Sequence, residues 1–302
     1  VVVAIGGGSV IDAGKAISAM IHAEGSVELY LEEVGAPSRH PGSKVPFIAV
    51  PTTAGTGSEA TKNAVLSRTG PGGFKRSLRH DGFVPDVAIV DPVLALTCPR
   101  AVTAACGMDA LTQLLESFVS TRATPFTDDM CRSGLGAVAG SLLPVCGDGG
   151  ADPVHRSRMA YAAMLSGITL SNAGLGVVHG IASELGAAFG VPHGVACGTV
   201  LAGATEATVL RLLASAPEGP ALKKYAEAGE ILCGRTFRGP AEGAHALVEL
   251  LVEWTHGLDI PRLGRYGMKQ PDKDAIAARS GNKNNPAQLT AREIGEILGF
   301  RI

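Results

Sequence analysis

The first hundred residues alternate short apolar runs with turns rich in glycine, threonine and serine. The runs at 1–5, 45–50 and 87–91 are almost entirely apolar, which is typical of strands covered on both faces of a parallel sheet. Between the first two runs, residues 10–22 place apolar side chains at helical spacing. This alternation predicts an α/β domain, to which we assign residues 1–98.

After Pro99 the pattern changes to long stretches rich in alanine, leucine and glycine, with an apolar period near 3.6 residues. Turn residues interrupt this period several times. Breaks between helices are expected at 120–124, 146–153, 172–175, 190–192, 214–220, 233–240 and 257–271. The pattern therefore predicts an all-helical domain over residues 99–302.

The composition indicates a folded protein with a large core. Of the 302 residues 46% are hydrophobic, and 26 basic residues nearly balance 28 acidic ones, for a net charge of −2. We therefore expect no cationic surface that would bind nucleic acid or an anionic membrane. No uninterrupted apolar run is long enough to predict a membrane span.

The six cysteines are scattered along the chain without a C-x-x-C pair. This spacing predicts neither a disulfide framework nor a cysteine metal site. A reducing, cytoplasmic location fits such a chain best.

The chain opens directly on an apolar strand. An α/β nucleotide domain normally contains several βα units, with roughly 30 residues in each βαβ unit. We therefore expect the α/β domain to be incomplete at its start.

A glycine triplet, Gly6-Gly7-Gly8, follows the first predicted strand and precedes the first predicted helix. Glycines at this point let backbone N–H groups approach a pyrophosphate, and Ser9 adds a hydroxyl at the helix N-terminus. The alternative is an ordinary turn in which Ser9 caps the helix. The triplet alone does not decide between them.

A second polar loop, residues 51–59, follows the second predicted strand and reads PTTAGTGSE. It holds four hydroxyl side chains and two glycines. A simple capped turn needs fewer hydroxyls, so we interpret this loop as one that lines a polar ligand.

Three residues of the helical half suggest a metal site. Asp109 lies on the first long predicted helix, and His179 and His193 lie on either side of a break at 190–192. Two imidazoles and one carboxylate are a common ligand set for Fe²⁺ or Zn²⁺. The alternative is that each histidine is a hydrogen-bonded core or capping residue.

Together these segments resemble the iron-containing (group III) alcohol dehydrogenases, which are related to glycerol dehydrogenase and dehydroquinate synthase. The similarity spans residues 1–302 and rests on five motifs in chain order. These are GGGSVIDAGKA, PTTAGTGSEAT, FVPDVAIVDPVLALTCP, GMDALTQLLESFVS and VVHGIASELGAAFGVPHGVA. The resemblance implies a doubly wound α/β dinucleotide-binding domain followed by an all-α metal-binding domain, as in dehydroquinate synthase.

The resemblance also implies roles for individual residues. The cofactor would contact Gly7, Gly8, Ser9, Asp12, Thr52, Thr53, Thr56, Ser58 and Lys75. The metal would be held by Asp109, His179 and His193. Gln113 stands where the family's usual fourth ligand is a histidine, and Ser183 stands where many members carry a histidine near the reacting oxygen. The amide oxygen of Gln113 would be a weaker donor for Fe²⁺ or Zn²⁺ than imidazole.

The function implied is hydride transfer between a small alcohol or aldehyde and NAD or NADP, with Fe²⁺ or Zn²⁺ as the metal. A cytoplasmic homodimer is the expected form. Two alternatives remain: a lyase of the dehydroquinate synthase type, and a nucleotide-binding relative without turnover. The first needs basic residues around a phosphorylated acid, and the predicted metal helices contain few.

Overall fold

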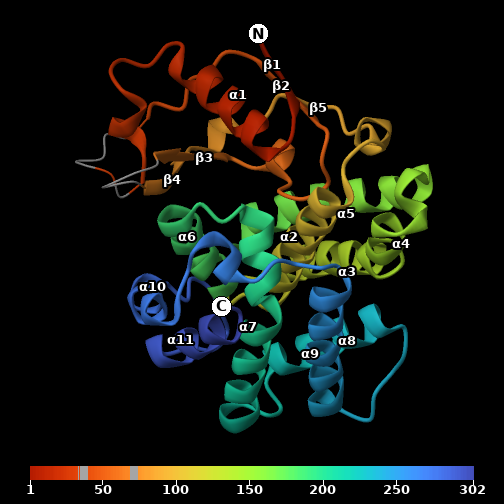
Figure 1. The fold of residues 1–302 in the computed structure, drawn as a ribbon. Coiled ribbons are helices and arrows are strands. Elements are labelled where there is room, and N and C mark those ends of the chain that lie inside the picture. The colour runs from red at the N-terminus through yellow and green to blue at the C-terminus, as the bar shows by residue number, and fades with distance from the viewer. Residues whose placement is uncertain (33, 35–39, 69–73) are drawn as a thin grey trace.

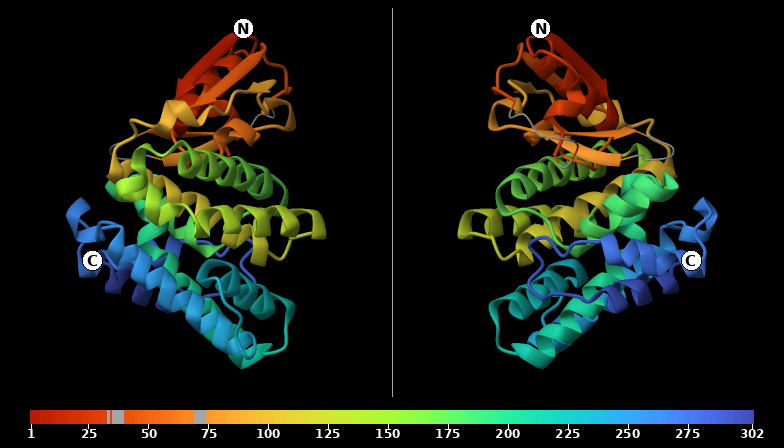
Figure 2. Two further views of the ribbon diagram at one scale, coloured as in Figure 1. Left: turned by 90° about the vertical axis from the view of Figure 1, so that its right-hand side faces the viewer. Right: turned by 90° about the vertical axis from the view of Figure 1, so that its left-hand side faces the viewer.

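The computed structural model describes residues 1–32, 34, 40–68 and 74–302. A small α/β part at the N-terminal end lies on one side of a larger domain made of helices (Figure 1). The two further views show the same stacking, with the N-terminus at the far end of the α/β part (Figure 2). The predicted order of an α/β part followed by a helical domain is confirmed.

The α/β part is built on a parallel sheet with the strand order β1-β2-β5. Its strands are β1 (Val2–Gly6), β2 (Phe47–Pro51) and β5 (Val87–Ala88). Gly6 pairs in register with Pro51, so the loops that follow β1 and β2 leave the same edge of the sheet side by side. Helix α1 (Gly8–Met20) packs on one face through Ile11, which joins a small core with Phe47.

Two features of this part differ from the sequence prediction. On the face of β1 away from α1, Val3 and Ile5 are 55% and 63% exposed, so β1 is not covered on both faces. An antiparallel hairpin, β3 (Asn63–Arg68) and β4 (Phe74–Arg79), lies between β2 and β5 in the chain. The apolar pattern missed it because both strands are short and at least half of the residues in each are polar. The hairpin is anchored through Ala64 and Leu78, which are buried beside α1.

The helical domain begins with α2, and its helices end close to the predicted breaks. They are α2 (Arg100–Val119), α3 (Pro125–Ala139), α4 (Leu142–Cys146), α5 (Pro153–Ala173), α6 (Val177–Phe189), α7 (His193–Ser215), α8 (Pro220–Cys233), α9 (Pro240–Gly257), α10 (Lys273–Arg279) and α11 (Ala291–Phe300). Two further breaks, at 140–141 and 280–290, were not predicted.

Several of these helices begin at a proline. Pro125, Pro153, Pro220 and Pro240 each occupy the first turn of a helix, where the missing N–H has no intrahelical partner to lose. Before Pro125, the side chain of Thr124 accepts a hydrogen bond from the backbone of the first turn and completes a capping box. These local signals explain why the breaks were visible in the sequence.

Helix α2 lies at the centre of the helical domain. Its residues from Gly107 to Val119 are all buried, and it packs against α3, α5 and α7. Helix α7 is long and apolar enough to cross a membrane by length and composition, but 72% of that stretch is buried inside the protein. We therefore interpret α7 as a core helix.

At one contact between the α/β part and the helical domain, the backbones of two glycines pack directly against each other. Gly57, in the loop after β2, has φ of +61°, and a β-carbon there would lie 2.5 Å from the backbone of Gly167 on α5. A β-carbon on Gly167 would lie 2.2 Å from the carbonyl oxygen of Gly57. Only a pair of glycines permits this approach, and it fixes the loop against α5.

We predict that Gly167→Ala lowers the free energy of unfolding by about 1–3 kcal/mol, because the new methyl group has no room beside the rigid backbone of Gly57. The control is Gly136→Ala on α3, where a β-carbon meets nothing within 4 Å. Relief of the glycine penalty should raise stability there by about 0.5–1 kcal/mol. Denaturant titrations of both variants measure the difference, and equal stability of the two would contradict the contact.

Candidate active site

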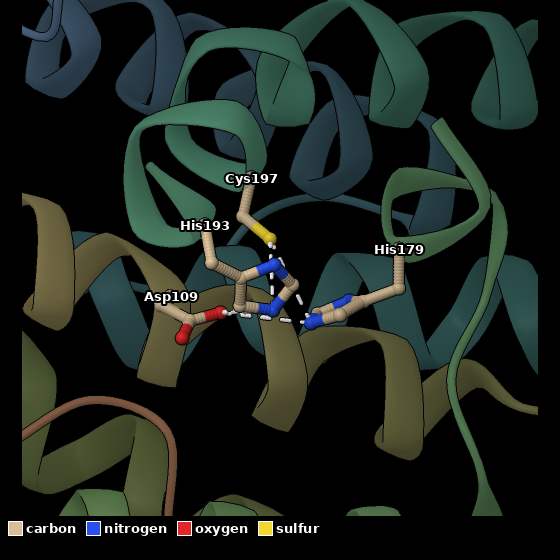
Figure 3. A group of neighbouring side chains, drawn as sticks. All are labelled: Asp109, His179, His193 and Cys197. Atoms are coloured by element: carbon tan, nitrogen blue, oxygen red, sulfur yellow. Dashed lines mark hydrogen bonds and ion pairs between the residues drawn. The ribbon is translucent and has the colours of Figure 1, made fainter. Parts of the chain in front are cut away.

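Four side chains of the helical domain converge on one point (Figure 3). They are Asp109 of α2, His179 of α6, and His193 and Cys197 of α7, and one ligand atom from each lies within 4.8 Å of all the others. Oδ1 of Asp109 lies 3.5 Å from Nε2 of His179 and 3.7 Å from Nε2 of His193. Below, these four residues are called the donor cluster.

The turn between α6 and α7 brings the two histidines together. Gly190 ends α6 in the left-handed conformation, with φ of +64° and ψ of 23°, and α7 starts three residues later at His193. The imidazole rings of His179 and His193 consequently lie with their centroids 5.3 Å apart. Cys197 follows His193 by four residues, so both side chains leave the same face of α7.

Oδ1 of Asp109 is a buried oxygen without a hydrogen-bond donor. The residue is only 1% exposed. A buried carboxylate without a partner is costly, so such an atom normally marks a place for a cation or another ligand. Two imidazole nitrogens and one carboxylate oxygen around a common point are a donor set that fits Fe²⁺ or Zn²⁺.

The electrostatics of the donor cluster also suit a cation. Burial lowers the pKa of His193 to about 3, so its ring is neutral and available as a ligand near pH 7. Burial raises the pKa of the Cys197 thiol to about 11. For His179, burial opposes protonation, but the surrounding Cys197 and acidic side chains raise its pKa well above the usual value. Positive charge is therefore favoured beside His179, whereas the ring of His193 stays neutral.

Glu116 orients His179 from behind. Its Oε2 lies 2.6 Å from Nδ1 of His179, and its Oε1 accepts a hydrogen bond of 2.7 Å from the backbone N–H of Val178. Because an ionised carboxylate only accepts, Nδ1 carries a proton, so in the neutral ring Nε2 is the free donor atom that faces the cluster. Carboxylate–histidine pairs of this kind set ring orientation in metal sites.

Gln113 and Ser183, the two departures from the family pattern, bond elsewhere. Oε1 of Gln113 accepts a hydrogen bond of 2.6 Å from the hydroxyl of Ser166 on α5. The hydroxyl of Ser183 donates to the backbone carbonyl of His179, 2.8 Å away and one turn earlier. Each polar group therefore has a partner within the helical packing.

Lys75 of β4 approaches the donor cluster from the α/β part. Its Nζ lies 3.5 Å from Nδ1 of His193. This is the ring nitrogen that faces away from Asp109, because Nε2 is the one that lies near the carboxylate. The structure thus puts this lysine beside the histidine. Its contact with the cofactor ribose stays a prediction.

The two predicted cofactor loops touch each other. A β-carbon on Gly8 would lie 2.6 Å from Cγ2 of Thr56, and one on Gly7 would lie 3.4 Å from Oγ1 of Thr53. The backbone N–H of Thr52 also bonds to the carbonyl of Gly6. The N-cap of α1 is Gly7, and Ser9 is exposed in the first turn, so the alternative of a Ser9 cap is wrong.

A hydrogen bond between Ser58 and Asp12 joins the loop after β2 to helix α1. The hydroxyl of Ser58 donates to Oδ1 of Asp12, and the backbone N–H of Val65 donates to Oδ2 over 2.9 Å. Both carboxylate oxygens thus have protein partners. Burial raises the pKa of Asp12, and the positive charge of Lys15 opposes that rise.

Lys15 is fully buried beneath the second loop. Its ammonium donates to the carbonyl oxygens of Ser58 and Thr61 over 2.8 Å and to that of Asn63 over 2.9 Å. Burial lowers the pKa of Lys15 to about 8. Three fixed carbonyls around one ammonium give the loop a defined shape before any ligand binds.

Sequence reasoning missed three of these residues. Cys197 was set aside because no C-x-x-C pair was present, although its spacing of four from His193 places both on one helix face. Glu116 follows Asp109 by seven residues and lies on the same face of α2, but its contact with His179 depends on the approach of α6 to α2. Nothing in the sequence indicated that Lys15 is buried.

Two family descriptions match the chain. "Iron-containing alcohol dehydrogenase" matches residues 1–92, and "Fe-containing alcohol dehydrogenase family, C-terminal" matches residues 103–300. Alcohol dehydrogenase 4 of Saccharomyces cerevisiae is 33% identical over 305 residues, covering 99% of this chain and 75% of the yeast protein. The probable alcohol dehydrogenase EutG of Escherichia coli is 41% identical over 197 residues, covering 65% of this chain and 48% of that protein. The match therefore spans about half the length of EutG.

Solved structures agree with these matches. 1,3-Propanediol oxidoreductase superposes with a TM-score of 0.86 at 32% identity, covering 99% of this chain and 76% of that chain. Sulfoacetaldehyde reductase from Bifidobacterium kashiwanohense was solved in complex with NAD+. It superposes with a TM-score of 0.83 at 27% identity, and the match covers 99% of this chain and 75% of the reductase chain. The described part of this chain thus shares the fold of these proteins.

We predict that Glu116→Gln weakens metal binding about 10- to 100-fold. The amide NH2 would donate a hydrogen bond to Nδ1 of His179, so the ring proton would lie on Nε2 and block the atom that faces the cluster. Glu184→Gln, on the same helix as His179 but paired outward with Arg279, is the control and should keep full affinity. Competition titrations with a metal indicator give both affinities, and equal values would refute the orienting role.

Proposed function

Because this chain belongs to the iron-containing alcohol dehydrogenase family, we propose that it works as a metal-dependent, NAD(P)-linked alcohol dehydrogenase. The proposal covers the whole protein, of which this chain aligns with 75% of the yeast relative and 48% of EutG. The observation that carries it is the buried Oδ1 of Asp109, which has no hydrogen bond and faces two imidazole nitrogens.

In this proposal Asp109, His179 and His193 hold a divalent cation, Fe²⁺ or Zn²⁺. When bound, such a cation lowers the pKa of an alcohol oxygen or polarises a carbonyl, and the nicotinamide ring accepts or returns the hydride. The protein itself supplies orientation. Glu116 keeps His179 in the correct tautomer, and the surrounding helices bury Asp109 and His179, while the side chain of His193 stays 30% exposed.

The nucleotide would bind at the touching loops after β1 and β2. Gly7 and Gly8 allow close approach of a pyrophosphate to the start of α1, while Thr53 and Thr56 contribute hydroxyls from the facing loop. The internal bonding of Asp12 supports a shaping role for that residue rather than direct contact with the ligand. Whether NAD or NADP is preferred is part of the test below.

The substrate would be a small primary alcohol or the matching aldehyde. Named relatives include 1-propanol dehydrogenase PduQ of Citrobacter freundii and 1,3-propanediol dehydrogenase of Klebsiella pneumoniae. We also propose the division into domains at 98/99, a homodimer and a cytoplasmic location. Free cysteines at all six positions support the last of these.

Gly8→Val should weaken NAD(P)H binding at least tenfold. The branched side chain would collide with Thr56, where even one β-carbon lies 2.6 Å from the neighbouring methyl group, and would force the two loops apart. Fluorescence titration with NADH and NADPH measures the affinity. Gly136→Ala is the control, and unchanged metal affinity of Gly8→Val would show that the helical domain is intact. Wild-type nucleotide affinity in Gly8→Val would exclude this loop as the binding site.

The decisive experiment for the function is an NAD(P)H-linked assay on the full-length protein loaded without oxygen with Fe²⁺ or Zn²⁺. Short-chain aldehydes should be reduced, a chelator should abolish the rate, and added metal should restore it. Asp109→Asn should lower the rate at least 100-fold, since it removes the charged ligand. Metal-loaded protein that binds nucleotide but turns over none of these substrates would favour the alternative without catalysis.

A further inference from the structure

We propose that Cys197 is the fourth protein ligand of the metal in this chain, in the place that Gln113 would otherwise fill. The inference rests on the metal site of the proposed function and goes beyond its three ligands. It assigns a thiolate from α7 to a site otherwise made of one carboxylate and two imidazoles.

The distances around the sulfur are those of a coordination shell. Sγ of Cys197 lies 3.7 Å from Nε2 of His179 and 3.9 Å from Nε2 of His193. Ligand atoms held at about 2.0–2.3 Å around one tetrahedral ion lie about 3.3–3.6 Å from one another. The separations of 3.5 and 3.7 Å from Asp109 Oδ1 to the imidazoles complete the same pattern. A small contraction would bring all four atoms to one ion.

The sulfur also points at the correct atoms. Its contacts are with the two Nε2 atoms that face Asp109, and Glu116 holds the proton of His179 on the opposite nitrogen. Figure 3 shows the thiol, both rings and the carboxylate directed toward a common centre. Cys197 itself is fully buried, so a packing role alone would satisfy it. The buried Oδ1 of Asp109, which has no hydrogen bond, is the independent sign that the centre accepts a ligand.

Gln113 is poorly placed to compete for this position. Its carbonyl oxygen, the only atom through which a glutamine amide binds such ions well, is engaged by the hydroxyl of Ser166 at 2.6 Å. Both residues are buried, so this hydrogen bond would have to be given up in a dry environment. Cys197 has no comparable bond to lose.

A thiolate changes what the site prefers. On binding, the thiol gives its proton to solvent, and the thiolate and the Asp109 carboxylate together neutralise a divalent ion. Thiolate is a soft donor and favours Zn²⁺ over Fe²⁺ more than a third imidazole would. With four protein ligands, binding of a substrate oxygen would require a fifth coordination position, an expansion that catalytic zinc sites can make.

The test is to replace the metal by Co²⁺ in the full-length protein and to record its absorption. Thiolate bound to Co²⁺ produces a charge-transfer band in the near ultraviolet that nitrogen and oxygen ligands do not produce. The wild-type protein should show this band. Cys197→Ser should lose it and bind Co²⁺ at least tenfold more weakly, whereas Cys131→Ser, a buried cysteine of α3 outside the donor cluster, should keep both band and affinity.

The outcomes separate this inference from the proposed function. Co²⁺ bound without the band, or a band that survives in Cys197→Ser, overturns the Cys197 ligand and leaves the metal site standing. No Co²⁺ binding to the wild-type protein overturns both. If Cys197→Ser does not fold, X-ray absorption of the Zn²⁺-loaded wild type decides, because a sulfur neighbour at about 2.3 Å is required. A shell of only nitrogen and oxygen overturns the inference.

Discussion

An acidic oxygen without a proton donor, placed in the centre of a helical core, is the constraint on which the rest of the site depends. Asp109 is carried by α2, the most enclosed helix of the described chain. A charge in that position destabilises the fold unless positive charge is brought to it. The turn at Gly190 brings the two imidazoles close to Asp109. The carboxylate of Glu116 holds a proton on Nδ1 of His179, so that Nε2 of this ring faces Asp109.

The sequence predicted those parts of the molecule that depend on local signals. Prolines at helix starts and glycines at helix ends made most breaks visible, and Asp109, His179 and His193 stood out by residue type. What it missed depends on contacts between distant segments. At least half of the residues in each strand of the hairpin β3–β4 are polar, and the hairpin is stabilised by packing on α1. Cys197 becomes a candidate ligand only because α2 and α6 bring Asp109 and His179 close to it.

Helix α5 links the two halves of the candidate site. Ser166 bonds to Gln113 on α2, and the next residue, Gly167, meets Gly57 in the loop after β2. One peptide unit of α5 therefore contacts both the helix that carries Asp109 and the loop assigned to the nucleotide. A shift of α5 would therefore move its contacts with α2 and with the loop after β2 at the same time.

The contact between Gly57 and Gly167 fixes the distance between the loop after β2 and helix α5. Side chains can change rotamer and so let neighbouring elements drift by an ångström or more, but two backbones in direct contact have no such freedom. Along this line the spacing between the loop after β2 and helix α5 is set by bond lengths and van der Waals radii. Hydride transfer, the reaction that we propose for this protein, is steeply sensitive to donor–acceptor distance, and the two glycines would therefore help to fix that distance.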